Sequence, residues 1–362
     1  MSEREVLVRG ARPYPVHIGP GALSGLPAAL GARTAFVLTD PNVEQLHARR
    51  LGAHTEARRH TVPPGEDGKR MAVLEQVLEV MAEAGLGRGG VLVALGGGSV
   101  GDLGGLAAAL YARGIDWVAC PTTLLAQVDA SVGGKTAVNL RAGKNLAGAF
   151  HPPAAVLADT EVLATLPEDE LRSGLGELVK TALIAGGELL ALVEDAAPRL
   201  VAREPEVLAR AVALAVAAKA RIVESDEREA GPREVLNLGH TFGHALEHAL
   251  GYGRIPHGVA VAAGVLLALE TSRRLGLLAE AHLGTRVSAI HARLGLPSSA
   301  GELRTLLSEA GVDRVLAAMR QDKKRHGAGA RLVLPIRAGE VSAGVEVEES
   351  FLQELLTSWQ LG

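Results

Sequence analysis

The chain has 362 residues, enough for two domains, and 48% of them are hydrophobic but only 2% aromatic, so its cores must be aliphatic. The formal net charge of −4 and the scarcity of aromatic residues argue against a nucleic acid or a membrane surface as partner. A single cysteine, Cys120, rules out a disulfide framework. The N-terminus lacks an apolar signal core and the most apolar segment, residues 259–270, is too short to span a bilayer, so we expect a cytoplasmic protein.

The first half of the chain alternates between short apolar runs and helical patterns. The apolar runs predict strands at residues 16–19, 35–40, 91–98 and 117–123. The clearest helical pattern covers residues 68–85, and the Pro- and Gly-rich residues 61–69 predict a loop. Strands that alternate with helices form mostly parallel sheets, so we expect a Rossmann-like α/β domain.

The second half is dominated by helical patterns. Helices are predicted at residues 168–186, 188–201, 205–226, 239–250, 258–275, 303–321 and 350–361. One late strand is expected at residues 330–336, followed by a hairpin near 337–347. The simplest organisation is an α/β domain over residues 1–165 and an all-α domain over residues 166–362, with an active site in the cleft between them.

A glycine-rich turn follows one of the predicted strands. Gly96, Gly98 and Gly101 satisfy the pattern G-x-G-x-x-G, in which backbone N–H groups approach a pyrophosphate at a helix start. The pattern lies far into the chain, and a tight strand–helix turn is the alternative interpretation. Asp40, which ends its strand, suits a ribose hydroxyl better than Asp116, which precedes the next strand.

Residues 120–153 form the most informative stretch, because many polar side chains accompany a glycine-rich backbone. That combination is costly to build for stability alone, and its lysines suit a phosphorylated or carboxylated ligand. A solvated loop is the alternative. The polar candidates are Thr122, Thr123, Asp129, Ser131, Lys135, Lys144, Asn145 and His151.

Four histidines and one glutamate are candidates for a metal site. His240, His244 and His248 recur every four residues and form a slightly drifting stripe on a predicted helix, with His257 following. Glu177 either pairs with Lys180 within its own helix or completes a His₂Glu zinc site. The residues alone leave open which histidines bind metal and which belong to surface or core. Other polar candidates in this region are Lys219, Arg233 and Asn237.

Six segments taken together resemble the 3-dehydroquinate synthases of the sugar-phosphate cyclase superfamily, from about residue 12 to the C-terminus and in the family's order. They read GGGSVGDLGGLAAALYARGI, ACPTTLLAQVDASVGGKTAVN, GKNLAGAFHPP, SGLGELVK, LNLGHTFGHALEH and DKK at 322–324. The resemblance implies a homodimer that uses NAD and Zn²⁺ or Co²⁺. It also implies conversion of a phosphorylated keto acid, 3-deoxy-arabino-heptulosonate 7-phosphate, to 3-dehydroquinate and phosphate.

The resemblance also assigns roles to individual residues. The metal ligands it implies are Glu177, His240 and His257, while His248 receives no role. The substrate phosphate is assigned to Lys135, Asn145, His244, one of Lys323 and Lys324, and Arg113, which reaches across the dimer interface. The substrate carboxylate and hydroxyls are assigned to Lys219, Arg233 and Asn237. The remaining catalytic candidates are Lys180, Glu229 and Asp129. The NAD contacts are Asp40, Asn42, Glu66, Lys69, Gly96, Gly97, Gly98, Asp102, Thr122, Thr123, Lys144 and Thr165.

One departure from the family pattern concerns the third ligand. The family usually reads H-G-E there, whereas this chain has His257, Gly258 and Val259, so we expect a retained metal with altered surroundings. A second departure, Ala130 in place of a frequent serine, is a small change. The alternatives are another sugar-phosphate cyclase, whose substrate lacks the carboxylate that Arg233 suits, a metal-dependent polyol-phosphate dehydrogenase, or a non-catalytic nucleotide-binding module.

Overall fold

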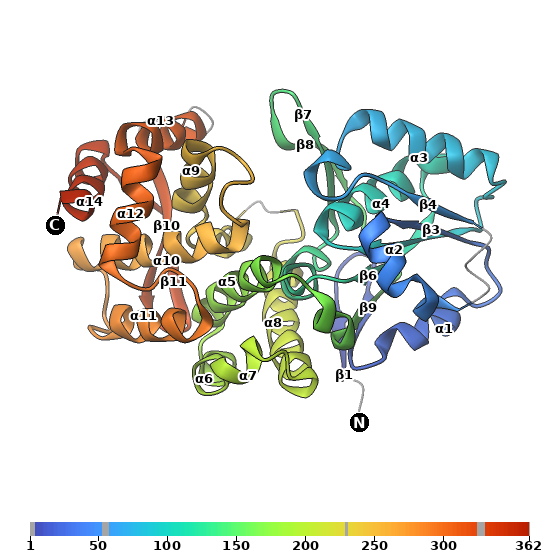
Figure 1. Ribbon diagram of the computed structural model, residues 1–362, viewed down its shortest axis with the longest axis horizontal. Helices are drawn as coiled ribbons and strands as arrows, with labels where there is room; N and C mark the ends of the chain where they lie inside the picture. Colours follow the sequence, from blue (N-terminus) through green and yellow to red (C-terminus); the bar gives the residue numbers. More distant parts are fainter. Residues whose placement is uncertain (1–3, 53–57, 229–230, 324–329, 362) are drawn as a thin grey trace. The chain divides into compact units, whose positions relative to one another are not determined.

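The computed structural model describes residues 4–52, 58–228, 231–323 and 330–361. The chain forms two compact units, coloured along the sequence in Figure 1. Unit 1 comprises Met1–Pro167 and Arg203–Arg228, and unit 2 comprises Glu168–Ala202 and Glu229–Gly362. The chain first passes between the units after Pro167, two residues beyond the expected boundary at 165, and residues 203–228 belong to unit 1 again. No helix among the described residues is long and apolar enough to cross a membrane.

A seven-stranded sheet forms the centre of unit 1, with strand order β1-β2-β9-β6-β5-β3-β4. Its strands are β1 (Arg4–Val8), β2 (Tyr14–Gly19), β3 (Ala35–Thr39), β4 (Arg59–Thr61), β5 (Val91–Gly96), β6 (Asp116–Pro121) and β9 (Ala155–Asp159). All neighbouring strands run parallel except β1 and β2. The central strands β5 and β9 are buried along their whole length, as continuous apolar runs in parallel sheets are.

Helices and short turns connect the strands of unit 1. The helices are α1 (Leu26–Leu30), α2 (Pro41–His47), α3 (Met71–Glu83), α4 (Gly98–Leu110) and α8 (Pro205–Ser225). The 3-10 turns are η1 (Ala22–Gly25), η2 (Ala48–Leu51), η4 (Gly65–Asp67), η5 (Tyr111–Arg113) and η7 (Thr160–Thr165). The helix predicted at 68–85 is confirmed as α3. Helix α8 packs against β1 and β2, and this contact explains why it belongs to unit 1.

The stretch 120–153 contains more regular structure than its sequence predicts. A π-helical turn, η6 (Ala126–Ala130), is followed by an antiparallel hairpin of β7 (Lys135–Leu140) and β8 (Gly143–Phe150). The hairpin alternates only partly between buried and exposed positions, and several of its apolar side chains, such as Phe150, are exposed. Short strands of this kind carry a weak periodic signal.

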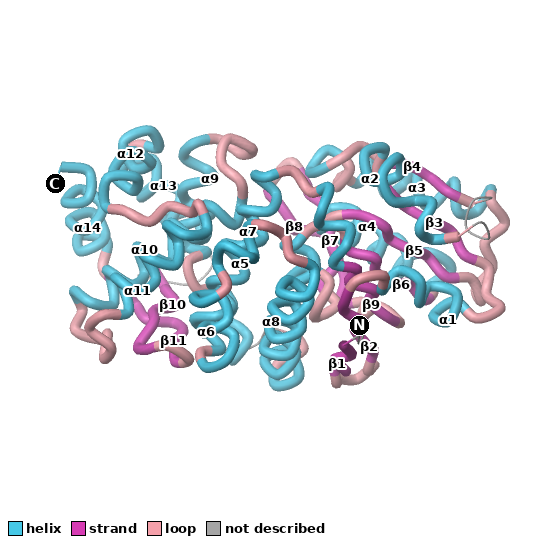
Figure 2. Tube along the Cα trace, turned by 60° about the horizontal axis from the view of Figure 1, so that its bottom comes forward, coloured by secondary structure: helices cyan, strands magenta, loops and turns pink. Residues whose placement is uncertain are grey.

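Unit 2 is mostly helical and contains one two-stranded ribbon, drawn in magenta among the helices in Figure 2. Its helices are α5 (Glu168–Ala185), α6 (Gly187–Asp195), α7 (Ala197–Val201), α9 (His240–Leu250), α10 (His257–Arg274), α11 (Leu283–Leu294), α12 (Ala300–Ala310), α13 (Val312–Lys323) and α14 (Glu349–Leu361), with a 3-10 turn η8 (Pro232–Asn237). The ribbon pairs β10 (Ala330–Arg337) with β11 (Glu340–Val347), which confirms the predicted late strand and hairpin.

Two of the helices predicted in unit 2 are each divided in the structure. The helix expected at 188–201 is α6 and α7, which are separated at Ala196. The single helix expected at 303–321 is two helices, α12 and α13, because Gly311 between them has a φ of 78°. Glycine adopts this left-handed conformation without steric cost, so the chain turns there.

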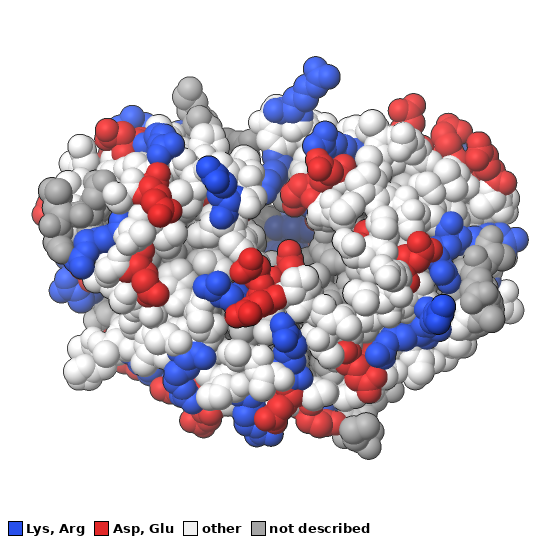
Figure 3. Space-filling model, viewed as in Figure 1, with Lys and Arg blue, Asp and Glu red and all other residues white. Residues whose placement is uncertain are grey.

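On the face viewed in Figure 3, basic and acidic side chains are interspersed over the surface of each unit.

Candidate functional site

A buried glutamate and two histidines of unit 2 converge at one point. Glu177 on α5 is 1% exposed, and its Oε1 lies 3.5 Å from Nε2 of His240 on α9 and 3.3 Å from Nε2 of His257 on α10. Its other oxygen, Oε2, lies 2.5 Å from Nζ of Lys180, one turn along α5. Glu177 therefore makes both of the contacts that the sequence left as alternatives, the ion pair with Lys180 and the approach to the histidines.

Both histidines have their Nδ1 atoms engaged, and this orients the rings. Nδ1 of His240 lies 3.3 Å from the carbonyl of Leu238, and Nδ1 of His257 lies 3.0 Å from Oε2 of Glu247. In a neutral imidazole, an acceptor at Nδ1 favours the tautomer with its proton there, so that Nε2 is the nitrogen available to a metal. The two Nε2 atoms and Oε1 of Glu177 thus form a donor set that fits a divalent transition metal.

His244 on α9 extends this cluster. The nitrogen atoms that His240, His244 and His257 offer as ligands all lie within 4.8 Å of one another, so these three residues form a second possible donor set. The ring of His244 lies 5.2 Å from that of His240 and is exposed. His248 is also exposed, and its ring lies 6.1 Å from that of Tyr252. The stripe seen in the sequence is therefore divided, with His248 outside the cluster.

The protonation states of the cluster follow from burial and neighbouring charge. Burial, aided by Lys180, lowers the pKa of His240 to about 3, so this imidazole is neutral. Burial opposes the charged form of His257 as well, but its hydrogen bonds with Glu177 and Glu247 outweigh that effect and raise its pKa to about 10. Burial would raise the pKa of Glu177, yet Lys180 and the two histidines hold it well below its usual range.

Close helix contacts through glycine bring these ligands together. A Cβ atom on Gly176 would lie 1.9 Å from the carbonyl oxygen of Gly258, and one on Gly258 would lie 1.8 Å from that of Ser173. The backbone N–H of Gly258 also donates to Oγ of Ser173 at 2.9 Å. Because Glu177 and His257 are the direct neighbours of these glycines, the glycines let α5 and α10 approach closely enough for the two ligands to meet.

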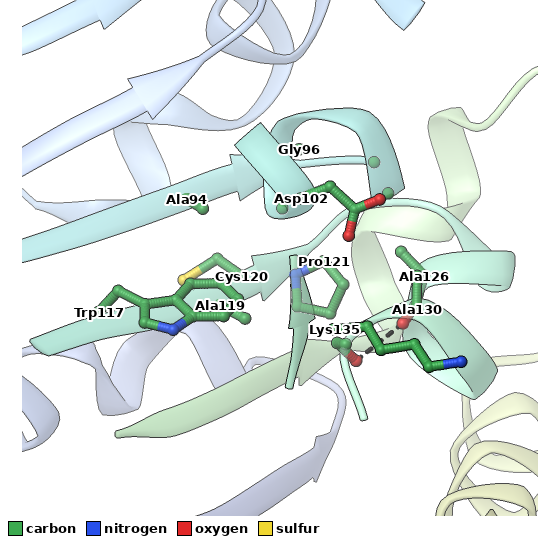
Figure 4. A pocket seen from close by; sticks show the side chains of 14 residues that line it. Ala94, Gly96, Asp102, Trp117, Ala119, Cys120, Pro121, Ala126, Ala130 and Lys135 are labelled. Atoms are coloured by element: carbon green, nitrogen blue, oxygen red, sulfur yellow. Dashed lines mark hydrogen bonds between the residues drawn. The ribbon is translucent and has the colours of Figure 1, made fainter. Parts of the chain in front are cut away.

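A pocket in unit 1 runs along strands β5 and β6, from Ala94 and Trp117 to the carboxyl ends of the strands at Gly96 and Pro121 (Figure 4). The glycine-rich turn lines it at the start of α4, together with Asp102 from α4 and Lys135 from β7. Ligands of open parallel sheets bind at this end of the strands, and the start of α4 offers N–H groups to an anion. The full lining is Ala94, Gly96, Gly97, Gly98, Gly101, Asp102, Trp117, Ala119, Cys120, Pro121, Ala126, Ala130, Ser131 and Lys135.

Two ion pairs border the same region. Lys69 donates to the carboxylate of Asp102, whose pKa is raised because burial outweighs the attraction of that lysine. Nζ of Lys219 on α8 donates to the carbonyl oxygen of Asp129 at 2.6 Å and to its Oδ1 at 2.8 Å. The second pair connects α8 to η6. Helix α8 therefore brings Lys219, a predicted substrate residue, to unit 1.

Asp40 and Asp116, the two sequence candidates for a ribose contact, have different surroundings. Oδ1 of Asp40 caps α2 by accepting the N–H groups of Asn42 and Val43. Asp116 stands at the beginning of β6, where Arg12 and Arg33 donate to it at 2.5 and 2.8 Å. A parallel strand begins at the edge opposite its ligand-binding end, so Asp116 is placed as an ion-pair residue.

Asn139 is a residue of this region that the sequence does not single out. Its side chain donates to Glu66, and its Oδ1 accepts the backbone N–H of Asn145 at 3.0 Å. Asn145 has a φ of 58°, in the left-handed region. Asn139 therefore supports a strained backbone at one predicted site residue while contacting another. No sequence signal marks it, because the contact partners lie on different elements.

The remaining predicted site residues are placed as follows. Arg233 is buried in η8 and Asn237 is half-buried at its end. Arg113 is exposed with a φ of 68°, and Lys144 is exposed on β8. Thr122 is buried, Thr123 caps the N–H of Ala126, and Oγ1 of Thr165 lies 2.9 Å from Nε2 of His47. The backbone of Lys323 ends α13, while Glu229 and Lys324 lie outside the described residues.

Two other polar candidates of the stretch 120–153 bind backbone carbonyls. His151 Nε2 lies 2.9 Å from the carbonyl of Ile115, and Ser131 donates to that of Ala126 at 2.7 Å. These contacts give both side chains a structural role.

Comparison with known proteins identifies the family. Family models of the N-terminal and C-terminal parts of 3-dehydroquinate synthase match residues 59–173 and 174–325. The 3-dehydroquinate synthase of Azotobacter vinelandii is 44% identical over 353 residues, which cover 96% of this chain and 94% of that protein.

Two solved synthase structures share the fold. A structure of 2-deoxy-scyllo-inosose synthase with carbaglucose-6-phosphate, NAD⁺ and Co²⁺ has a TM-score of 0.86 at 25% identity, covering 99% of this chain and 100% of that one. The 2-epi-5-epi-valiolone synthase of Streptomyces hygroscopicus, with NAD⁺ and Zn²⁺, has a TM-score of 0.84 at 30% identity, covering 98% and 99%. Since both family models and a relative of nearly equal length match, this chain belongs to the 3-dehydroquinate synthase family.

Proposed function

We propose that this chain converts 3-deoxy-arabino-heptulosonate 7-phosphate to 3-dehydroquinate and phosphate, a step of the shikimate pathway that leads to aromatic amino acids. The reaction comprises oxidation of a hydroxyl, elimination of phosphate, reduction of the carbonyl, ring opening and intramolecular aldol closure. The observation that carries the proposal is the convergence of Glu177, His240 and His257 in a chain of this family.

Two bound groups complete the chemistry. When bound, NAD would supply a hydride acceptor that is regenerated within each turnover, and a divalent metal held by Glu177, His240 and His257 would supply a Lewis acid for the hydroxyl that is oxidised. Solved relatives carry NAD⁺ with Co²⁺ or Zn²⁺. In this chain, the pocket along β5 and β6 suits NAD, because its glycines and the start of α4 present N–H groups to a pyrophosphate.

The polar residues of each unit have distinct tasks in this proposal. In unit 2, Glu177, His240 and His257 hold the metal, while the exposed ring of His244 beside them contacts the substrate phosphate. In unit 1, Lys135 stabilises the negative charge of phosphate as its C–O bond breaks and the electron pair leaves with the phosphate oxygen.

Other residues bind the substrate carboxylate and hydroxyls. Arg233, with its planar guanidinium, suits the carboxylate, and its burial makes that contact strong. Lys219 and Asn237 contact hydroxyls, and Lys219 is already oriented by Asp129. The further residues that we assign to the substrate are Arg113, Asn145, Lys180, Glu229, Lys323 and Lys324.

The rival functions fit less well. The two solved synthase structures that contain NAD⁺ and a metal share 25% and 30% identity with this chain, whereas the relative named 3-dehydroquinate synthase shares 44%. A polyol-phosphate dehydrogenase consumes NAD in proportion to product and has no use for a phosphate-eliminating site. These differences favour the heptulosonate phosphate as substrate.

We further propose that the chain acts as a homodimer in the cytoplasm. The exposed position of Arg113 suits a residue that contacts substrate in a second copy. The single cysteine, Cys120, is buried and unpaired with another thiol, as suits a reducing compartment. Light scattering coupled to size-exclusion chromatography tests the dimer, and a monomer peak under assay conditions would contradict it.

The central experiment follows phosphate and NADH together in one cuvette. Purified protein receives Zn²⁺, NAD⁺ and the heptulosonate phosphate, and we expect many turnovers of phosphate release with no net NADH. The variant His240→Asn serves as a control and is expected to release no phosphate. Net NADH that rises with product would indicate a dehydrogenase. Turnover only with sedoheptulose 7-phosphate or glucose 6-phosphate would indicate another cyclase.

A further inference from the structure

Glu247 on α9 is a buried carboxylate to which the family resemblance assigns no role. Glu247 is 4% exposed, and its Oε2 lies 3.0 Å from Nδ1 of His257. The opposite ring nitrogen of His257, Nε2, faces Oε1 of Glu177 at 3.3 Å. The imidazole of His257 is therefore held between two carboxylates, one at each nitrogen.

Glu177 and Glu247 have different roles because they contact opposite nitrogens of the His257 ring. Glu177 faces the point at which the nitrogen of His240 also converges, 3.5 Å away. Glu247 lies on the far side of the His257 ring and makes no such approach to His240 among the described contacts. Glu177 is thus placed as a ligand, whereas Glu247 is placed behind a ligand.

The acceptor for Nδ1 of His257 comes from a different helix than His257 itself. Val259, two residues after His257, is 6% exposed and apolar, so its side chain offers no hydrogen bond to the metal centre. Altered surroundings are expected for the third ligand from the sequence. In the structure, a carboxylate does meet His257, and it comes from the neighbouring helix α9 rather than from α10.

We propose that Glu247 is a positioning residue that accepts the Nδ1–H of His257, directs Nε2 toward the metal and raises the affinity of the site for it. The physical basis is general: an acceptor on the remote nitrogen fixes the tautomer and ring orientation of a histidine ligand and increases its basicity. This inference rests on the proposed metal-dependent function. Its test measures metal affinity, so it can fail while the catalytic proposal stands.

The experiment compares Glu247→Leu and Glu247→Gln with the wild type, after metal removal. Zn²⁺ affinity is measured by competition with a chromophoric chelator, and Co²⁺ is added separately to record its visible absorption spectrum. Glu247→Leu is expected to weaken Zn²⁺ binding by about 10- to 100-fold and to alter the Co²⁺ spectrum. Glu247→Gln keeps an acceptor oxygen of the same reach, so most of the affinity is expected to return.

His248→Asn is the matched control, because His248 is the next residue on α9 but is exposed and lies outside the cluster. It is expected to keep wild-type affinity and spectrum. Thermal unfolding of the metal-free variants distinguishes the positioning role from a merely structural one. A merely structural role would lower the melting temperature of the variant without changing its Co²⁺ absorption spectrum. If Glu247→Leu does not fold, Glu247→Asp replaces it, since the shorter side chain withdraws the carboxylate from Nδ1.

Wild-type Zn²⁺ affinity and an unchanged Co²⁺ spectrum in a folded Glu247→Leu or Glu247→Asp protein would overturn the positioning role. A wild-type protein that binds neither metal would overturn both this inference and the metal assignment beneath it. Normal metal binding with no phosphate release would instead contradict only the proposed function.

Discussion

At the scale of single residues, two histidines of the candidate metal centre have opposite protonation states. His240 is neutral and can donate a lone pair directly, whereas His257, between Glu177 and Glu247, holds a proton when no metal is present. A metal that binds His257 must displace the proton from Nε2, so binding releases a proton into solution. Metal binding therefore requires His257, but not His240, to lose a proton, although both residues are placed as ligands.

The choice between the two donor sets is testable with single substitutions. If the ligands are Glu177, His240 and His257, Glu177→Gln should weaken Zn²⁺ binding by more than about 100-fold, beyond the loss typical of a residue behind a ligand. His244→Asn should leave Zn²⁺ affinity nearly unchanged while lowering the rate of phosphate release. Chelator competition and a phosphate assay measure the two quantities. The reverse pattern would make His244 the ligand and Glu177 its neighbour.

Another buried histidine, His291, lies outside the site and makes stability depend on pH. His291 is fully buried, its Nδ1 lies 2.7 Å from the carbonyl of Pro297, and burial lowers its pKa to about 4 from 6.5. Between these two values, the unfolded chain binds a proton that the folded chain does not. The stabilisation is therefore complete above pH 6.5 and is lost as the pH falls toward 4.

His291→Gln should remove much of this dependence, because glutamine can donate to the same carbonyl without titrating. Between pH 7 and pH 5, the wild type should lose about 2 kcal/mol more unfolding free energy than the variant. Urea unfolding at both pH values measures the difference. His282→Gln, at an exposed position before α11, is the control and should behave like the wild type. Equal pH dependence in wild type and His291→Gln would contradict the assignment.

At the scale of elements, the contact between α5 and α10 decides whether the ligands can meet. A methyl group on Gly258 would lie 1.8 Å from the carbonyl of Ser173, so the helices must separate to accept it. We expect Gly258→Ala to cost about 1–3 kcal/mol of stability and to weaken Zn²⁺ binding, because His257 moves away from Glu177. Differential scanning calorimetry and chelator competition measure the two effects.

Gly284→Ala is the matched control for that substitution. Gly284 lies in α11, and nothing stands within 4 Å of a Cβ added there. Alanine has the higher helix propensity, so this variant should be about 0.5–1 kcal/mol more stable and should bind Zn²⁺ normally. Normal Zn²⁺ binding by a folded Gly258→Ala protein would show that the close approach does not control the site.

The elements with long periodic patterns were predictable, and those decided by a single residue or a tertiary contact were not. Helices α3 and α10 lie close to their predicted bounds, because α3 has an apolar face that recurs over several turns and α10 is a long, nearly continuous apolar segment. The break between α12 and α13 depends on one glycine inside an otherwise continuous pattern, at Gly311. The β7–β8 hairpin has too little alternation to be recognised.

The residues of the candidate site also differ in whether the sequence predicts them. Glu177, His240 and His257 were found because they lie in recognisable family motifs, and the structure brings them together. Glu247 and Asn139 were missed, because a polar residue in a helix or strand carries no signal until its partner arrives from another element. Residues that act through other residues are therefore the part of a site that sequence patterns conceal.

At the scale of the whole molecule, the candidate NAD and metal sites lie in different units. The pocket beside Gly96–Gly98 is built by unit 1, and Glu177, His240 and His257 belong to unit 2. We therefore expect a chelator to abolish phosphate release while leaving NADH binding nearly unchanged. Fluorescence titration with NADH and a phosphate assay measure the two, and added Zn²⁺ or Co²⁺ should restore turnover. A parallel loss of NADH affinity would contradict the separation.

The return of α8 to unit 1 has a consequence for inheritance. The chain passes between the units after Pro167, Ala202 and Arg228, so neither unit is encoded by one continuous stretch of gene. A single recombination event near residue 167 would separate α8 from β1 and β2, and would leave its apolar face without the strands that bury it. Exchange of one intact unit between related genes requires breaks at all of these places. The two halves of the catalytic machinery are thus expected to descend together, and their phylogenetic trees should coincide.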